Sequence, residues 1–295
     1  MLRPIGTLTA AARRLRDGDR DGRVPESGRD ELSELARAFN QMADSVRAAQ
    51  DDQRRLIADV AHELRNPLSN VRGYLEALQD GVVDPTPDLF ASLHEEVLLN
   101  QRIVGDLQEL ALAEAGALVY HRSPTDLAEL IERARVAHRT AADAAGVTLT
   151  VAADGPVIAD VDPDRIRQVV GNLVGNALRA TPAGGSITLS AGTDGDGVVL
   201  RVADTGAGIA AEHLPHVFDR LWRARPYRDR GSGLGLAIVR QIVRDHDGDV
   251  SAHSVEGAGA TFEIRLPAAV SPPRSPTSAA GPARDDRAGT ARPPG

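Results

Sequence analysis

Three polar residues near position 62 have the types and the spacing for acid–base or phosphoryl chemistry. His62 and Glu63 are adjacent in the segment HELRNPL, and Asn66 follows His62 by one helical turn. The HExxH pattern of zinc peptidases is excluded, because it needs a second histidine where this chain has Asn66. Taken alone, an exposed His–Glu pair on a helix is usually a solvated surface pair. A functional interpretation therefore depends on residues elsewhere in the chain.

A pair of asparagines in the C-terminal half could serve a metal ion. Asn172 and Asn176 lie one helical turn apart, with Arg179 close by. Two amides at this spacing can present oxygens to a hydrated Mg²⁺, which prefers oxygen ligands and keeps several waters. The signal is weak by itself, since pairs of asparagines are common on helix surfaces.

The segment DTGAGI, residues 204–209, has the composition of a base-binding turn at the end of a strand. Asp204 can accept a hydrogen bond from an adenine amino group. Gly206 and Gly208 would let the backbone approach the ring closely, because they carry no Cβ.

An arginine-rich segment and a glycine loop follow. Residues 216–230, HVFDRLWRARPYRDR, should begin as a short helix and continue as a loop that closes over phosphates with side chains such as Arg220. Residues 231–239, GSGLGLAIV, should open a helix whose N-terminus and backbone N–H groups suit a triphosphate. A dinucleotide-binding motif is disfavoured, because its glycines would have to follow a strand directly. The candidate residues of this loop are Gly231, Gly233, Leu234, Gly235 and Leu236.

Composition removes several classes of function. The chain of 295 residues has no cysteine, which excludes disulfides, thiolate zinc sites and cysteine nucleophiles. It also has no lysine. P-loop nucleotidases and eukaryotic-type protein kinases both place a lysine at the phosphates, so both classes are disfavoured. The formal charge of −8 argues against a nucleic-acid partner. No apolar run approaches the ~20 residues needed to cross a bilayer, so we expect a cytoplasmic chain with membrane contact only through an upstream segment.

The elements that must position His62 are helical. A short helix is expected over residues 1–16, then a Gly/Asp-rich connector with Val24, then a heptad seam that starts after a cap at Asp30. The seam continues into the His62 helix, and a second amphipathic helix follows a turn at residues 80–87. Such a hairpin exposes its apolar stripe unless it dimerises into a four-helix bundle. The seam residues are Leu32, Leu35, Phe39, Met42, Val46, Leu56, Val60, Leu64, Leu68, Val71, Leu75 and Leu78.

The pattern changes to mixed α/β after residue 123. Asp126 with Glu129 forms a capping box, and Pro163 suits the first turn of another helix. Strands are expected at residues 147–153, 156–160, 186–191, 197–204, 249–254 and 260–266, and helices at about 126–145, 163–180 and 234–245. Beyond residue 267 the chain lacks periodicity, which predicts a disordered tail.

Taken together and in this order, the motifs of the α/β part resemble the N, G1, F and G2 boxes of the histidine-kinase ATP-binding domain. HELRNPL resembles the H box of that family, GAGATF at residues 257–262 resembles its last glycine box, and DELSELARAFNQMADSV at residues 30–46 resembles a HAMP module. The chain departs from the family at Arg179, where lysine is frequent, and at Ala180, where tyrosine is frequent.

The resemblance to two-component sensor histidine kinases implies a domain order. Residues 1–51 would form a HAMP-like module, residues 52–118 the dimerising phosphotransfer hairpin, residues 119–267 a Bergerat-type α/β-sandwich that binds ATP, and residues 268–295 the disordered tail. It also implies a homodimer and a response-regulator partner whose receiver aspartate takes the phosphoryl group.

The same resemblance implies roles for residues. His62 would be the phosphoacceptor, Asn176 the Mg²⁺ ligand and Asp204 the adenine-recognising group. Asn66 would orient a water for the reverse, phosphatase, reaction, and Glu63 is placed to take the proton from the second imidazole nitrogen. Two alternatives stay open: a non-catalytic scaffold gated by nucleotide, and an ATPase of the chaperone or topoisomerase type.

Overall fold

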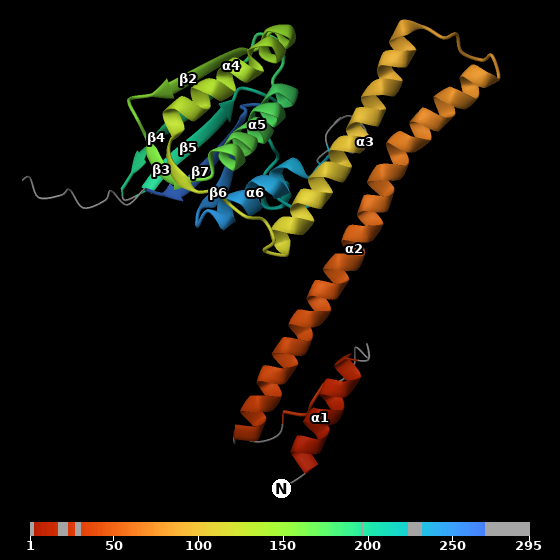
Figure 1. Cartoon of the computed structure of the whole chain (residues 1–295), viewed down its shortest axis with the longest axis vertical. Coiled ribbons are helices and arrows are strands. Elements are labelled where there is room, and N and C mark those ends of the chain that lie inside the picture. Colours follow the sequence, from red (N-terminus) through yellow and green to blue (C-terminus); the bar gives the residue numbers. More distant parts are fainter. Residues whose placement is uncertain (1–2, 17–22, 27–30, 196, 224–231, 269–295) are drawn as a thin grey trace, which may run out of the picture.

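A computed structural model describes residues 3–16, 23–26, 31–195, 197–223 and 232–268. An elongated helical part leads into an α/β domain, which lies beside one of the long helices (Figure 1). The expected tail and the expected cap at Asp30 lie outside the described residues. None of the helices in the described ranges is long and apolar enough to cross a bilayer.

The N-terminal part consists of α1 (Arg3–Arg16) packed against the start of α2 (Glu31–Gln79). A small cluster joins them, and Val24 of the connector belongs to it. Asn40 holds the connector, because its amide accepts from the N–H of Val24 at 3.0 Å and donates to the carbonyl of Val24 at 2.9 Å. The buried residues of the cluster are Ala11, Val24, Ala36, Phe39 and Ala43.

The predicted heptad seam is only partly the face that packs against α1. Phe39 is buried there, but Leu35, Met42 and Val46 are exposed, and the small residues Ala36 and Ala43 take their place in the cluster. The close approach of α1 explains this choice, because alanine lets two helix backbones come together. The larger apolar residues remain on a surface that this single chain does not cover.

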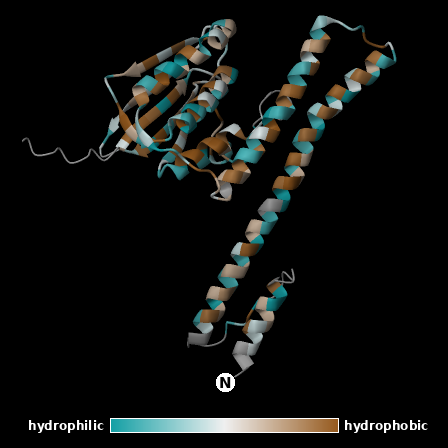
Figure 2. Cartoon of the chain, in the orientation of Figure 1, coloured by the Kyte–Doolittle hydropathy of each residue, from teal (hydrophilic) through white to brown (hydrophobic). Residues whose placement is uncertain are grey.

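The turn of the hairpin lies where it was predicted, between the end of α2 at Gln79 and the start of α3 at Pro87. Helix α2 is continuous through Pro67, and α3 (Pro87–Glu114) begins after Thr86, whose hydroxyl accepts from the N–H of Leu89 at 3.2 Å. Hydrophobic residues recur along both helices (Figure 2). Leu68 and Leu75 keep 57% and 47% of their surface exposed. The stripe predicted from the sequence is therefore only partly covered in one chain, since its other members are half-buried.

The α/β domain contains a five-stranded sheet in the order β2-β4-β5-β7-β6, in which only β2 and β4 are parallel. A separate antiparallel pair joins β1 (Ser123–Asp126) to β3 (Ile158–Val161). The sheet strands are β2 (Thr148–Ala153), β4 (Ser186–Asp194), β5 (Gly197–Asp204), β6 (Asp249–Ser254) and β7 (Ala260–Pro267). The helices of this domain are α4 (Leu127–Ala145), α5 (Pro163–Ala180) and α6 (Gly235–Asp245).

The domain is a two-layer sandwich, as predicted. Helices α4 and α5 lie over one face of the sheet (Figure 1), and the core between the layers is built from aliphatic side chains such as Leu173, Leu189 and Ile264. The other face carries polar residues, among them the ion pair between Arg201 and Glu263 at 2.6 Å. One apolar and one solvated face is the usual arrangement of a largely antiparallel sheet.

Two local predictions differ from the structure. Strand β1 was not expected, because SPTD has no alternation of apolar and polar residues and gains its place by pairing with β3. The short helix expected from His216 is wrong, because a 3₁₀ turn, η1 (Leu214–His216), ends at that residue and turns follow it up to Leu221.

Candidate active site

A cavity of about 550 Å³ lies between α5, the start of α6, the ends of β5 and β7, and α3. Its volume falls in the range of roughly 300–1,000 Å³ that is usual for small-molecule sites. The cavity collects most of the residues that the sequence pointed to. The predicted residues lining it are Asn172, Asn176, Arg179, Asp204, Gly208, Gly233, Gly235 and Leu236.

Asp204 is a nearly buried carboxylate at the end of β5. Its Oδ1 accepts hydrogen bonds from the backbone N–H of Gly206 at 2.8 Å and of Ala260 at 3.3 Å. Burial raises the pKa of this carboxyl, and the two N–H donors oppose that effect only in part. The hydrogen bonds described for Asp204 all use Oδ1. The group is therefore fixed in orientation and still lines the cavity.

Glycine is required where the chain turns beside this carboxylate. Gly208 has φ +69°, and a Cβ there would lie 2.2 Å from the carbonyl oxygen of Val255. Gly259 has φ +88°, and its Cβ would come within 1.9 Å of the backbone oxygen of Asp204. The backbones of residues 204–208 and 257–260 are thus in direct contact. Together these two segments form the floor of the cavity.

Helix α5 presents its polar side to the cavity because its apolar side faces the sheet. Asp162 caps it by accepting from the N–H groups of Asp164 and Arg165, and Pro163 occupies the first turn. Asn176 accepts a hydrogen bond from the Arg179 guanidinium. Asn172 donates from its amide nitrogen to the carbonyl of Gly235 at 3.3 Å.

The glycine loop follows a segment that folds back on it. Gly233 has φ +69°, and its carbonyl accepts from the N–H of Leu221 at 2.9 Å. A Cβ at Gly233 would lie 2.8 Å from the Cα of Leu221. This contact joins Leu221 of the arginine-rich segment to the glycine loop, and residues 224–231 are not described.

Not every predicted residue contributes a cavity surface. The side chain of Leu234 is buried in the core, and its N–H donates to Ser232 Oγ at 3.2 Å. Gly206 supports Asp204 from behind, and Arg220 is not among the lining residues. Gly231 lies outside the described residues. Leu234 and Gly206 therefore support the shape of the site.

The helical stalk, which we define as α2 with α3, reaches the cavity at two points that the sequence did not reveal. Arg223, which lines the cavity, donates from Nη2 to Oε2 of Glu63 at 2.6 Å. Ser232, at the start of the glycine loop, donates from Oγ to Oδ2 of Asp106 on α3 at 2.7 Å. Burial raises the pKa of the Asp106 carboxyl, and the hydrogen bond from Ser232 opposes this. No motif in the sequence connects Asp106 to the glycine loop, so only the docking of α3 could identify that contact.

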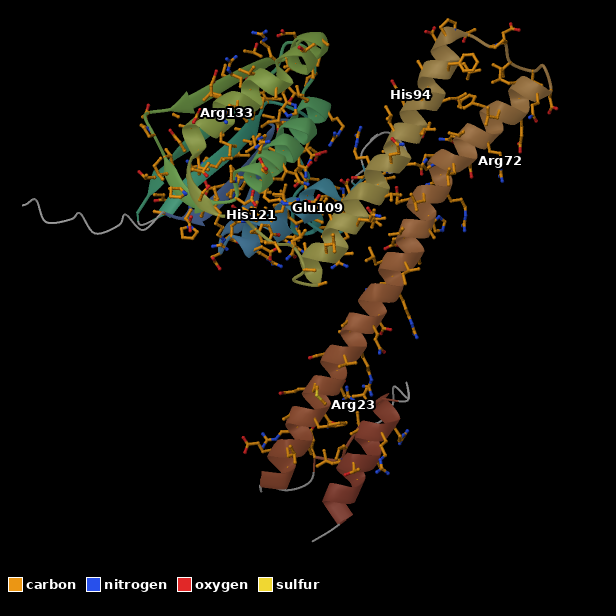
Figure 3. The ribbon with its side chains drawn as sticks, in the orientation of Figure 1. Arg23, Arg72, His94, Glu109, His121 and Arg133 are labelled. Atoms are coloured by element: carbon orange, nitrogen blue, oxygen red, sulfur yellow. The ribbon has the colours of Figure 1, made fainter. Side chains whose placement is uncertain are left out.

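The docking of α3 on the α/β domain is both apolar and ionic. Ile103 and Leu110 are buried along α3. Glu109 accepts from the guanidinium of Arg165 and from the amide of Gln168, both on α5. Figure 3 shows Glu109 at this border.

The linker after α3 adds further contacts. Tyr120 Oη donates to Asp245 at 2.6 Å, and Arg122 Nη1 donates to Asp247 at 2.8 Å, at the end of α6. The N–H of His121 donates to Oδ2 of Asp162 at 2.8 Å. The linker is thereby tied to both helices that border the cavity.

His62 lies on the solvent side of α2, as the sequence predicted. Its side chain is exposed, Asn66 is exposed one turn later, and Glu63 is half-buried against Arg223. An imidazole on the stalk thus stands next to the residue that contacts the edge of the cavity. The arrangement suits the transfer of a group from a ligand in the cavity to a nucleophile on the helix.

Comparison with known families agrees with each part of this architecture. Residues 1–48 match the HAMP domain, and residues 52–116 match the His Kinase A (phospho-acceptor) domain. Residues 161–270 match the histidine kinase-, DNA gyrase B- and HSP90-like ATPase domain.

Individual histidine kinases are similar to most of this chain. The signal transduction histidine-protein kinase BaeS of Escherichia coli (strain K12) is 40% identical over 271 residues, which cover 90% of this chain and 58% of BaeS. The histidine kinase AdeS of Acinetobacter baumannii is 29% identical with a TM-score of 0.61, over 70% of this chain and 98% of the AdeS chain. Full-length ShkA in complex with AMPPNP is 28% identical with a TM-score of 0.55, over 74% of this chain and 46% of ShkA.

This chain thus spans little more than half the length of BaeS. Within that span it carries the HAMP, phosphoacceptor and ATPase-type domains in unbroken order, each with the fold that its sequence predicted. The chain therefore belongs to the sensor histidine kinases of two-component systems.

Proposed function

We propose that this chain is a protein-histidine kinase that autophosphorylates on His62 and passes the phosphoryl group to an aspartate of a response regulator. The observation that carries the proposal is the contact between Arg223 of the cavity and Glu63, the neighbour of His62. It brings the predicted nucleophile and the nucleotide cavity to one place in the molecule.

The cavity has the features that ATP needs. Asp204 offers a buried carboxylate for the adenine amino group, and the glycine loop opens α6 with backbone N–H groups that suit phosphates. At Gly208 and Gly259, in the floor of the cavity, the backbone opposite leaves no room for a side chain. The AMPPNP complex of ShkA supports a nucleotide of this kind.

The side chains of the cavity offer a magnesium ion one suitable donor, the amide oxygen of Asn176. Among the described residues no group of three or more His, Asp or Glu side chains could form an all-protein metal site. Asn176 offers an amide oxygen that Arg179 also contacts, which suits an ion held chiefly by phosphate oxygens and water. When bound, Mg²⁺ would neutralise phosphate charge, and Asn176 is the side chain that would hold it.

In the proposed transfer, Nε2 of neutral His62 forms a bond to the terminal phosphorus of ATP. The bond from that phosphorus to its bridging oxygen breaks, and ADP leaves with the electron pair. Glu63 accepts the proton released from Nδ1 of His62. In the second transfer a receiver aspartate oxygen forms a bond to the phosphorus and the bond from Nε2 of His62 to the phosphorus breaks. Nδ1 of His62 takes back the proton held by Glu63, so that His62 leaves as neutral imidazole. Asn66, exposed one turn beyond His62, is placed to orient a water for dephosphorylation.

The stalk supports a homodimer. Leu68, Leu75, Val97, Leu98 and Val104 are large apolar residues that stay exposed in one chain. Contiguous apolar surface of this kind usually marks an interface. A second copy would cover it by forming a four-helix bundle.

The HAMP domain and the sensor kinase relatives support a cytoplasmic segment of a membrane sensor.

Labelling from ATP tests the proposal directly. The chain, incubated with γ-labelled ATP and Mg²⁺, should acquire an acid-labile label, and His62→Gln should acquire none while still binding nucleotide. Labelling that persists in His62→Gln would overturn the phosphoacceptor assignment. Release of phosphate without protein labelling would indicate an ATPase, and nucleotide binding with neither would indicate a scaffold.

A further inference from the structure

Helix α3 forms part of the wall of the nucleotide cavity. Arg102 and Asp106 are separated by one helical turn, and both line the cavity together with residues of α5 and the glycine loop. In the sequence they belong to the stalk and carry no nucleotide-binding motif. Their place in the wall follows from the docking of α3.

The position of this wall is set by Asp106. Its carboxylate accepts from Ser232 Oγ at 2.7 Å, and Ser232 directly precedes Gly233 and the first turn of α6. The start of α6 is the end of the cavity at which a phosphate is favoured, because backbone N–H groups and the helix dipole face it. Arg102 therefore stands beside the phosphate end.

The charges of the cavity single out Arg102. Among the described residues, three arginines line it. Arg179 donates to Asn176, and Arg223 is paired with Glu63. Arg102 forms no hydrogen bond or ion pair with any residue in the described ranges and acts only electrostatically on Asp106. Its guanidinium is the cavity cation that remains available to a polyanionic ligand.

The backbone that carries Arg102 is held in place. Ile103, the next residue, is fully buried, and Glu109 is bonded to Arg165 and Gln168 two turns further on. Sites built on helices and strands are placed more precisely than sites built on loops. The planar guanidinium also matches phosphate oxygens in a bidentate manner.

We propose that Arg102 is a phosphate-binding residue which the stalk supplies to the nucleotide site of the same chain. The proposal rests on the function proposed above. It makes the site composite, because the ATPase-type domain provides the base pocket and most of the phosphate cradle, and α3 provides one further cation. Arg102 is a binding residue that positions the phosphates, with no role in bond breaking assigned to it.

Equilibrium binding to the full chain tests this inference without relying on catalysis. Trp222 is the only tryptophan of the chain and lines the cavity, so its fluorescence reports occupancy, with calorimetry as a second measurement. We expect Arg102→Gln to weaken AMPPNP binding about tenfold, as the loss of a hydrogen bond to a charged group would. Adenosine, which has no phosphate, should bind unchanged, and Arg102→Lys should retain part of the AMPPNP affinity.

Arg133→Gln is the matched control. Arg133 is an exposed arginine on α4, paired with Glu129 and away from the cavity lining (Figure 3). The Arg133→Gln variant should bind AMPPNP and adenosine with the affinities of the unsubstituted chain. The inference is overturned if Arg102→Gln binds AMPPNP as tightly as the unsubstituted chain. It is also overturned if AMPPNP and adenosine are weakened equally, since that indicates a merely structural role. If the unsubstituted chain binds neither ligand, the proposed function itself fails, which is a different result from either of these.

Discussion

Arg223 Nη2 lies 2.6 Å from Glu63 Oε2, although 160 residues separate the two in the sequence. The arginine belongs to the segment that leads into the glycine loop, and the glutamate is the neighbour of His62. Their side chains are only 14% and 22% exposed, so the pair is shielded from solvent and salt. The contact joins the nucleotide cavity and the phosphoacceptor helix.

This pair should behave as a coupled unit. We expect Glu63→Gln and Arg223→Gln each to slow the labelling of His62, and the double variant to slow it less than the sum of the single effects, with a coupling energy of about 1 kcal/mol. The measurement is a double-mutant cycle on the initial rate of autophosphorylation. Glu129→Gln and Arg133→Gln form a control cycle on an exposed ion pair of α4. Additive effects at Glu63 and Arg223 would show that the contact has no part in the reaction.

The floor of the cavity should not tolerate a side chain at Gly208. Gly208→Ala places a Cβ 2.2 Å from the carbonyl oxygen of Val255 at φ +69°. We expect a loss of about 2–4 kcal/mol in the free energy of unfolding and a loss of AMPPNP binding. Gly192→Ala is the control, because nothing lies within 4 Å of its Cβ position. Thermal denaturation compares the two variants, and equal melting temperatures would contradict the close approach.

The stability of the α/β domain should fall in mild acid because of His246. Burial lowers the pKa of this histidine, whose ring accepts from the N–H of Asp162 at 3.0 Å and contacts the carbonyl of Ile242 at 2.7 Å. The unfolded chain then binds more protons than the folded one, so stability is present above the unfolded pKa of about 6.5 and is lost as the pH decreases below it.

The measurement is the melting temperature between about pH 7.5 and pH 5.5. Burial also lowers the pKa of His138, which adds to the effect, while the raised pKa values of Asp106 and Asp204 act in the opposite direction. The comparison of His246→Gln with the unsubstituted chain isolates one group. We expect His246→Gln to be less stable at neutral pH and to depend less on pH. His94→Gln, at an exposed histidine of α3, should leave the pH dependence as it is, and an equally steep profile in His246→Gln would refute the assignment.

The exposed stripe of the hairpin should hold two copies together. Leu75→Glu places a charge on a residue that is 47% exposed in one chain and would be buried in a four-helix bundle. We expect sedimentation to show a shift from dimer to monomer. Arg72→Gln, on an exposed part of the same helix, is the control and should remain dimeric (Figure 3). A dimer that persists in Leu75→Glu would place the interface on another face.

Local chemistry determined most of what the sequence predicted correctly. Helix α4 starts directly after its cap Asp126, and α5 starts at Pro163, which suits a first turn. Both effects act within a few residues. The glycines at positions 208 and 233 mark turns for the same local reason, since both have positive φ. The position of His62 on the exposed side of its helix was therefore readable from spacing, whereas the segments of the cavity were assigned from their order and their resemblance to the histidine-kinase boxes.

The tertiary structure decided which segments meet. Asp106 and Arg102 look like ordinary polar residues of an amphipathic helix, and only the docking of α3 places them at the glycine loop. Likewise, Ala36 and Ala43 pack against α1 while the seam residues Leu35 and Met42 stay exposed, because the distance between two backbones selects small residues. Periodicity records that a side chain is buried or exposed. It holds no information on which distant surface covers that side chain, because that depends on how whole elements fit together as rigid bodies.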